Sequence, residues 1–128
     1  MFIFRINFLT PMSSDLEQST FHIQSIFFAM FQSRIEKSGL QPYQYFQEAL
    51  DKLMGEYDPN YSEKLKRLMP VSLDLNYHVL RSIYLTKDQR TMIKNFADKA
   101  STVLGQNVQS GTVMRTAIID YSGFRHLI

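Results

Sequence analysis

The stretch Leu80-Arg-Ser-Ile-Tyr-Leu-Thr-Lys-Asp-Gln89 decides the predicted fold, because it joins two different local patterns. Its first six residues are β-prone and would place Ile83 and Leu85 together on the buried side of a strand. Its last four follow the Thr-x-x-Gln capping box, in which two side chains bond to backbone amides at the start of a helix. A strand that leads directly into a helix is therefore predicted here.

Two helices are expected after this strand. The first begins at the capping box and ends at Gly105, and Ser110 can cap the second, which ends at Gly123. Apolar residues recur at helical spacing in both, at Ile93, Phe96, Ala97, Ala100 and Leu104 and then at Val113, Met114, Ala117, Ile118 and Tyr121. The predicted C-terminal order is strand, helix, helix.

Residues Val71–Val79, just upstream, alternate between apolar and polar side chains, which is typical of a half-buried strand. One or two strands are therefore expected between residues 71 and 85. The Asn-Tyr-His segment at 76–78 is the only plausible break between them, because no Gly or Asn-Gly turn marks a hairpin.

Three helices are predicted in the first half of the chain. Their expected limits are the Ser14-x-x-Glu17 capping box to Gly39, Pro42 to Gly55, and Asp58 to Pro70. The first has a broad apolar face rich in Phe and Met, which indicates a core or an interface with a partner. This face includes Phe27, Met30 and Phe31.

Length and composition indicate an ordinary globular chain, either one compact domain or two very small ones. The chain has 128 residues, of which 45% are apolar and 20% charged. Residues 1–70 carry 7 basic and 8 acidic side chains, a net of −1, whereas residues 71–128 carry 7 basic and 4 acidic ones, a net of +3. We expect a mainly α fold with one or two short β-strands. It would divide into a helical region at 1–70, for dimerisation or partner binding, and a strand-helix-helix unit at 71–128.

The strand-helix-helix unit resembles the ribbon-helix-helix family of DNA-binding proteins over about a third of the chain. The strand joined to its Thr-x-x-Gln cap carries part of the resemblance. The last helix, Ser110-Gly-Thr-Val-Met-Arg-Thr-Ala-Ile-Ile-Asp-Tyr121, carries the rest, since it is similar to the family's Ser-x-x-x-x-Arg-x-Ala-Ile-x-x-Tyr pattern.

This resemblance implies a homodimer that binds duplex DNA. Two copies of the strand would pair into an antiparallel ribbon that enters the major groove and meets base edges. The exposed positions would be Leu80, Ser82 and Tyr84, with Arg81 on the other face unless the register slips by one residue. The chain departs from the family here, because this face has only weak hydrogen-bonding capacity.

Contacts with DNA phosphates are expected from two other places. The start of the last helix, at Ser110, Gly111 and Thr112, would offer backbone amides and the positive end of the helix dipole. Lys87, Arg90 and Lys94 share one face of the preceding helix and would add long-range attraction. Alternatively, these three cations form a solvated face balanced by nearby aspartates.

A second possibility is that the first half of the chain repeats the unit. It would then consist of a strand at 2–9, a helix at 14–37 and a second helix from residue 41, so that one chain supplies both strands of the ribbon.

No enzyme activity, metal site or cofactor is expected. The chain has no cysteine, and His22, His78 and His126 are scattered without another ligand at metal-binding spacing. Neither a Gly-rich phosphate loop nor a nucleophile elbow is present.

No targeting or membrane segment is expected either. Arg5 and Asn7 interrupt the apolar N-terminus, and Phe21–Phe31 is too short and too polar to span a bilayer. We therefore expect a cytoplasmic protein without membrane contact, with Met12 as an alternative start to Met1.

These patterns together predict a small DNA-binding protein, such as a transcriptional repressor or an accessory factor of a plasmid or phage. The alternative is an α-rich interaction adaptor or chaperone that captures a protein partner through its first helix and binds no nucleic acid.

Overall fold

The computed structural model describes residues 16–56 and 78–121, and it confirms a mainly helical fold with two short strands. The elements in chain order are β1 (Glu17–Gln24), α2 (Ser25–Ser38), α3 (Pro42–Glu56), β2 (His78–Leu85), α5 (Lys87–Leu104) and α6 (Ser110–Tyr121). β1 and β2 form a two-stranded antiparallel sheet, which we call the ribbon. The helix predicted at 58–70 lies outside the described residues, as do residues 71–77 of the strand segment expected at 71–79.

The predicted long helix from Ser14 is wrong over its first part, because Glu17–Gln24 is a strand and α2 begins only at Ser25. Side chains alternate along β1: Phe21 and Ile23 are buried, whereas Thr20 and His22 are exposed. Pairing with β2 and burial of one face outweigh the local capping signal at Glu17, since a strand is stabilised by its neighbours more than by local propensity. α2 consequently starts without a side-chain cap.

The ribbon expected between two copies forms within one chain. β1 pairs with β2 along its whole length, from Glu17 opposite Leu85 to Gln24 opposite His78. β2 therefore has a partner strand without a second copy, and the reason for expecting a homodimer no longer applies.

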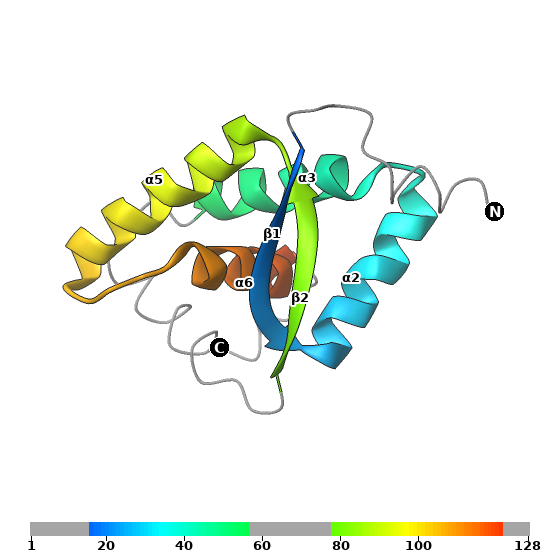
Figure 1. Cartoon of the computed structure of the whole chain (residues 1–128), viewed down its shortest axis with the longest axis horizontal. Coiled ribbons are helices and arrows are strands. Elements are labelled where there is room, and N and C mark those ends of the chain that lie inside the picture. Colours follow the sequence, from blue (N-terminus) through cyan, green and yellow to red (C-terminus); the bar gives the residue numbers. More distant parts are fainter. Residues whose placement is uncertain (1–15, 57–77, 122–128) are drawn as a thin grey trace.

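The chain contains the strand-helix-helix order twice. The first unit comprises β1, α2 and α3, and the second comprises β2, α5 and α6. Figure 1 shows the ribbon in front of α3 and α6, with α2 and α5 leaving it on opposite sides. α6 packs against β1 and α3 against β2, so each unit supports the strand of the other. A repeat of the element order is therefore present, but not with the expected bounds: its strand lies at 17–24 and its first helix begins at residue 25, whereas residues 2–9 are outside the described part of the chain.

Both units contribute to a single hydrophobic core behind the ribbon. The largest fully buried side chains are Ile23, Phe31, Phe46, Leu50, Leu53, Leu85, Ile93, Ile118 and Ile119. α3 and α6 pack directly on each other in this core. The predicted domain boundary near residue 70 lies outside the described residues, and the segments on either side of it share this core.

The proposed partner-binding face of α2 is turned largely inward. Phe31 is fully buried, with its ring edge-on to Tyr45 and Phe46 at centroid distances of 5.5 and 6.1 Å. Phe27 is also buried and Met30 is half-buried. Phe27 and Phe31 thus fill the core of their own chain and are not at the surface for a partner to contact.

The start of α5 confirms the predicted capping box. The Thr86 hydroxyl accepts from the Gln89 backbone amide at 3.1 Å, and the Gln89 side chain accepts from the Thr86 amide at 3.0 Å. Gly39 and Gly105 end α2 and α5 in the left-handed conformation, as their positions after each helical pattern indicate.

Candidate functional site

The outward side of the ribbon is the candidate site, and we call it the ribbon face. It comprises Gln18, Thr20, His22 and Gln24 from β1 and His78, Leu80, Ser82 and Tyr84 from β2. These side chains are exposed or half-buried, whereas the opposite side of the ribbon is covered by α3 and α6. The ribbon face carries amides, hydroxyls, imidazoles and one aliphatic side chain, but no Asp, Glu, Lys or Arg.

The register sets which side chains meet across the ribbon face. Thr20 lies opposite Ser82 at its centre, Gln18 lies opposite Tyr84 towards one end, and His22 lies opposite Leu80 towards the other. The Gln18 Nε2 donates to the Ser82 Oγ at 3.0 Å. The rings of His22 and His78 meet edge-to-face with their centroids 5.2 Å apart. These contacts present the polar side chains in defined positions.

β2 exposes the residues that the sequence indicated. Leu80 and Tyr84 have 56% and 39% of their surface exposed, while Ile83 and Leu85 are buried. Arg81 lies on the other side, opposite Phe21, so the register does not slip. Its guanidinium lies 5.9 Å from the centre of the Phe28 ring, and its Nη1 donates to the Leu80 carbonyl at 2.9 Å. Arg81 therefore points away from the ribbon face and is not part of it.

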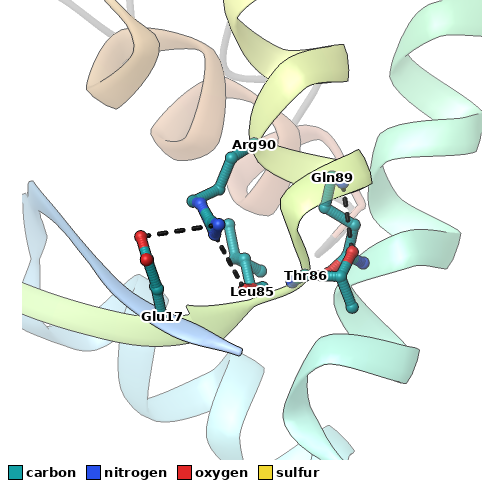
Figure 2. Close-up of polar contacts among 5 residues, drawn as sticks. All are labelled: Glu17, Leu85, Thr86, Gln89 and Arg90. Carbon is teal, nitrogen blue, oxygen red and sulfur yellow. Dashed lines mark hydrogen bonds and ion pairs between the residues drawn. The ribbon is translucent and has the colours of Figure 1, made fainter. Parts of the chain in front are cut away.

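The three predicted cations of α5 have different surroundings. Arg90 places its Nη2 at 3.4 Å from the Glu17 Oε1 and donates from its Nη1 to the Leu85 carbonyl at 3.4 Å, as Figure 2 shows. Arg90 thus links the first residue of β1 to the last residue of β2. Lys94 pairs with Asp98 at 3.9 Å, with both side chains largely exposed. Lys87 is exposed at the first position of α5, directly beyond the ribbon.

The start of α6 is packed beneath β1. A Cβ on Gly111 would lie 3.5 Å from the Cβ of Phe21, and Thr112 is buried. Arg115 donates to the Thr112 hydroxyl at 3.2 Å and to the His22 carbonyl at 2.9 Å, and burial lowers the pKa of its guanidinium. Of the three residues expected to meet phosphate, only Ser110 is well exposed. The local geometry assigns Thr112 and Arg115 to holding α6 against the ribbon.

Two polar clusters fasten the units together behind the ribbon. Gln89 is buried and donates to the Tyr43 carbonyl at 2.9 Å and to the Gln47 Oε1 at 3.0 Å, which ties α5 to α3. The second cluster joins α6 to α3, where the Tyr121 hydroxyl donates to the Glu48 carboxylate at 2.6 Å. That hydrogen bond, together with burial, raises the pKa of Tyr121 to about 12. The ribbon face therefore rests on helices that are cross-linked by specific side chains.

Half of the ribbon face could not be found by reading the C-terminal unit alone. Gln18, Thr20 and His22 were predicted to lie on a helix. The available signal was the period of two along β1, where these residues alternate with Ser19, Phe21 and Ile23. That signal was masked by the capping box, and the pairing of β1 with a strand so distant in the chain has no local signature.

Metal-binding clusters and membrane-spanning helices are both absent from the described part of the chain. Within residues 16–56 and 78–121, no three His, Asp or Glu side chains are grouped so as to hold a metal ion. Nor is any helix in these ranges long and apolar enough to cross a membrane. Comparison with models of protein families, with curated proteins and with solved structures finds no match to this chain.

Proposed function

We propose that this protein binds duplex DNA by inserting the ribbon into the major groove. The observation that carries the proposal is the ribbon face itself, a two-stranded antiparallel surface with polar side chains outward and its other side buried on helices. The major groove is about 12 Å wide and admits a two-stranded ribbon, whose outward side chains then reach base edges. This arrangement is the one that the resemblance to ribbon-helix-helix proteins implies, with one chain supplying both strands.

The chemistry of the ribbon face suits base edges. Gln18 can form paired hydrogen bonds with an adenine, Thr20 and Ser82 can donate to or accept from any base pair, and exposed Leu80 can contact a thymine methyl group. β1 adds the amides and the hydroxyl of Gln18, Gln24 and Thr20 to the weak hydrogen-bonding capacity of Leu80, Ser82 and Tyr84. The absence of carboxylates from the face also avoids repulsion by phosphates.

Attraction to the phosphates would come from cations beside the ribbon. Lys87 lies directly beyond the end of the ribbon, and Arg81 belongs to β2 although it points away from the ribbon face; both side chains are exposed. A protein of this kind occupies DNA without transforming it, which is the action of a repressor or of a plasmid or phage accessory factor in the cytoplasm. The proposal requires only one chain, since the ribbon needs no second copy.

A charge placed at the centre of the ribbon face tests the proposal. Binding of full-length protein to fluorescent duplex DNA would be measured over a series of salt concentrations. Thr20→Glu should weaken binding by at least about tenfold, because its carboxylate would face base edges and phosphates. Thr102→Glu makes the same change on an exposed site of α5, about 22 Å along the helix from its start, and should bind like the original protein.

Three results would count against the proposal. Failure of the original protein to retain DNA at low salt would exclude it and would favour the interaction-adaptor alternative. Equal binding by Thr20→Glu would place DNA away from the ribbon face. Affinity that does not fall as salt rises would show that phosphates are not contacted.

A second pair of matched variants tests whether a cation beside the ribbon contributes to DNA binding. Lys87→Ala should reduce the salt dependence of binding, whereas Lys99→Ala, exposed on the same helix but farther from the ribbon, should leave it unchanged. Equal effects of both variants would indicate only diffuse charge attraction.

A further inference from the structure

Building on the proposed DNA binding, we infer that this chain recognises an asymmetric, non-palindromic DNA sequence. When two identical strands form a ribbon, a two-fold axis makes its two ends alike, and the DNA site mirrors that symmetry. Here the two units are arranged in nearly the same two-fold way, but they belong to one chain and carry different sequences.

The register shows which positions would be equivalent. Thr20 faces Ser82, so an axis through this pair relates Gln18 to Leu80 and His22 to Tyr84. At the centre, the Thr20 hydroxyl corresponds to the Ser82 hydroxyl. On either side, however, an amide corresponds to an aliphatic chain and an imidazole corresponds to a phenol. The ribbon face is therefore two-fold in its backbone but not in its chemistry.

The two ends consequently offer different groups to DNA. The Gln18 end, formed by Gln18 and Tyr84, presents an amide with donors and an acceptor beside a phenol. The Leu80 end, formed by Leu80 and His22, presents an aliphatic side chain beside an imidazole that touches the ring of His78. The Gln18 amide can form hydrogen bonds with an adenine, whereas the Leu80 side chain can make an apolar contact with a thymine methyl group.

The helices that begin just beyond each end of the ribbon also differ in the residues they bring there. α5 begins beyond the Gln18 end and brings Lys87 and Arg90 there. α2 begins beyond the Leu80 end and exposes Ile26, an apolar residue with 63% of its surface accessible. One orientation on a given site should therefore be favoured over the reverse.

The expected site is short. The outward positions from Gln18 to Gln24 extend over roughly 20 Å at the rise of a strand, which matches about six base pairs of duplex.

Selection from random duplex DNA tests this inference. Full-length protein would be used to recover duplexes from a pool whose random region is about three times longer than the site of about six base pairs. The recovered sequences should share a consensus that differs from its own reverse complement. A duplex carrying that consensus should bind at least about fivefold more tightly than either palindrome built from its two halves, since one half of each palindrome meets the wrong end.

Two variants locate the ends on that consensus. Gln18→Ala should reduce base preference about tenfold at one end of the site only, and Leu80→Ala should reduce it, by less, at the other end. Both positions are exposed, and circular dichroism would confirm that the variants remain folded.

The outcomes separate the two proposals. If no DNA is recovered, DNA binding itself is wrong. If DNA is recovered without a consensus, or with a palindromic one, DNA binding stands and asymmetric recognition is wrong. If both variants alter the same end, the assignment of Gln18 and Leu80 to opposite ends is wrong.

Discussion

At the scale of single residues, Gln89 combines two roles that are usually separate. Its side chain completes the capping box of α5 with Thr86 and also bonds to Tyr43 and Gln47 of α3. Because Gln89 is buried, water cannot readily replace these bonds. The residue that caps α5 thereby also joins the second unit to α3 of the first unit.

Gln89→Ala should lower the free energy of unfolding by about 2 kcal/mol, since it removes the hydrogen bonds of the buried Gln89 side chain and leaves its part-buried partners without them. Urea denaturation would measure the change. Gln106→Ala, at an exposed position between α5 and α6, is the matched control and should change the stability by less than about 0.5 kcal/mol. Equal, small effects would show that the bonds between α5 and α3 contribute little.

Tyr121 makes the stability depend on pH at high values. Its folded pKa of about 12 lies above the ordinary 10, because the neutral hydroxyl donates to Glu48 and is partly buried. Its contribution is therefore fully present below pH 10 and is lost as the pH rises through about 12. Tyr121→Phe should be less stable than the original protein by about 0.5–1 kcal/mol at neutral pH. The difference should shrink as the pH approaches 12, and a difference that stays constant would contradict this role.

At the scale of elements, β1 is the part of the fold on which sequence and structure differ most. Adjacent side chains in a strand point to opposite sides of the sheet. Substitutions at neighbouring positions of β1 should therefore have very different effects on stability. Ile23→Asn should lower the free energy of unfolding by about 3 kcal/mol or more, because it buries an amide in the core. His22→Asn, one residue away and exposed, should cost less than about 0.5 kcal/mol. Thermal denaturation of both variants would check this, and similar losses at both positions would contradict the alternation.

The elements that were predicted correctly are those whose signals are local. α3, α5 and α6 follow from Pro42, the Thr86 capping box, Gly105 and the spacing of apolar residues. The outward and inward sides of β2 follow from alternation over 80–85.

The parts that could not be predicted depend on contacts between distant segments. Whether Glu17–Gln24 is strand or helix depends on the presence of β2 as its partner. For the same reason, the predicted site did not include Gln18, Thr20 and His22. For the Phe-rich face of α2, composition allowed either core or interface, and only the packing of α3 beneath it decides in favour of the core for Phe31.

At the scale of the whole molecule, the ribbon and core are complete within one chain, at least over residues 16–56 and 78–121. Folding should therefore not depend on association. The midpoint of thermal unfolding is expected to stay constant over about a hundredfold range of protein concentration. A midpoint that rises with concentration would show that a second copy contributes to the stability of the fold.

The pairing of β1 with β2 also has a consequence for how the protein is made. Gln18 and Ser82, which bond across the ribbon, are 64 positions apart, so β1 leaves the ribosome long before its partner strand exists. Until then its backbone edge is unpaired, and Phe21 and Ile23 lack part of the core that covers them. The α6 helix, which packs on β1, is synthesised later still. The ribbon is therefore expected to close after translation of the second unit, and a nascent chain halted before β2 should be prone to aggregation.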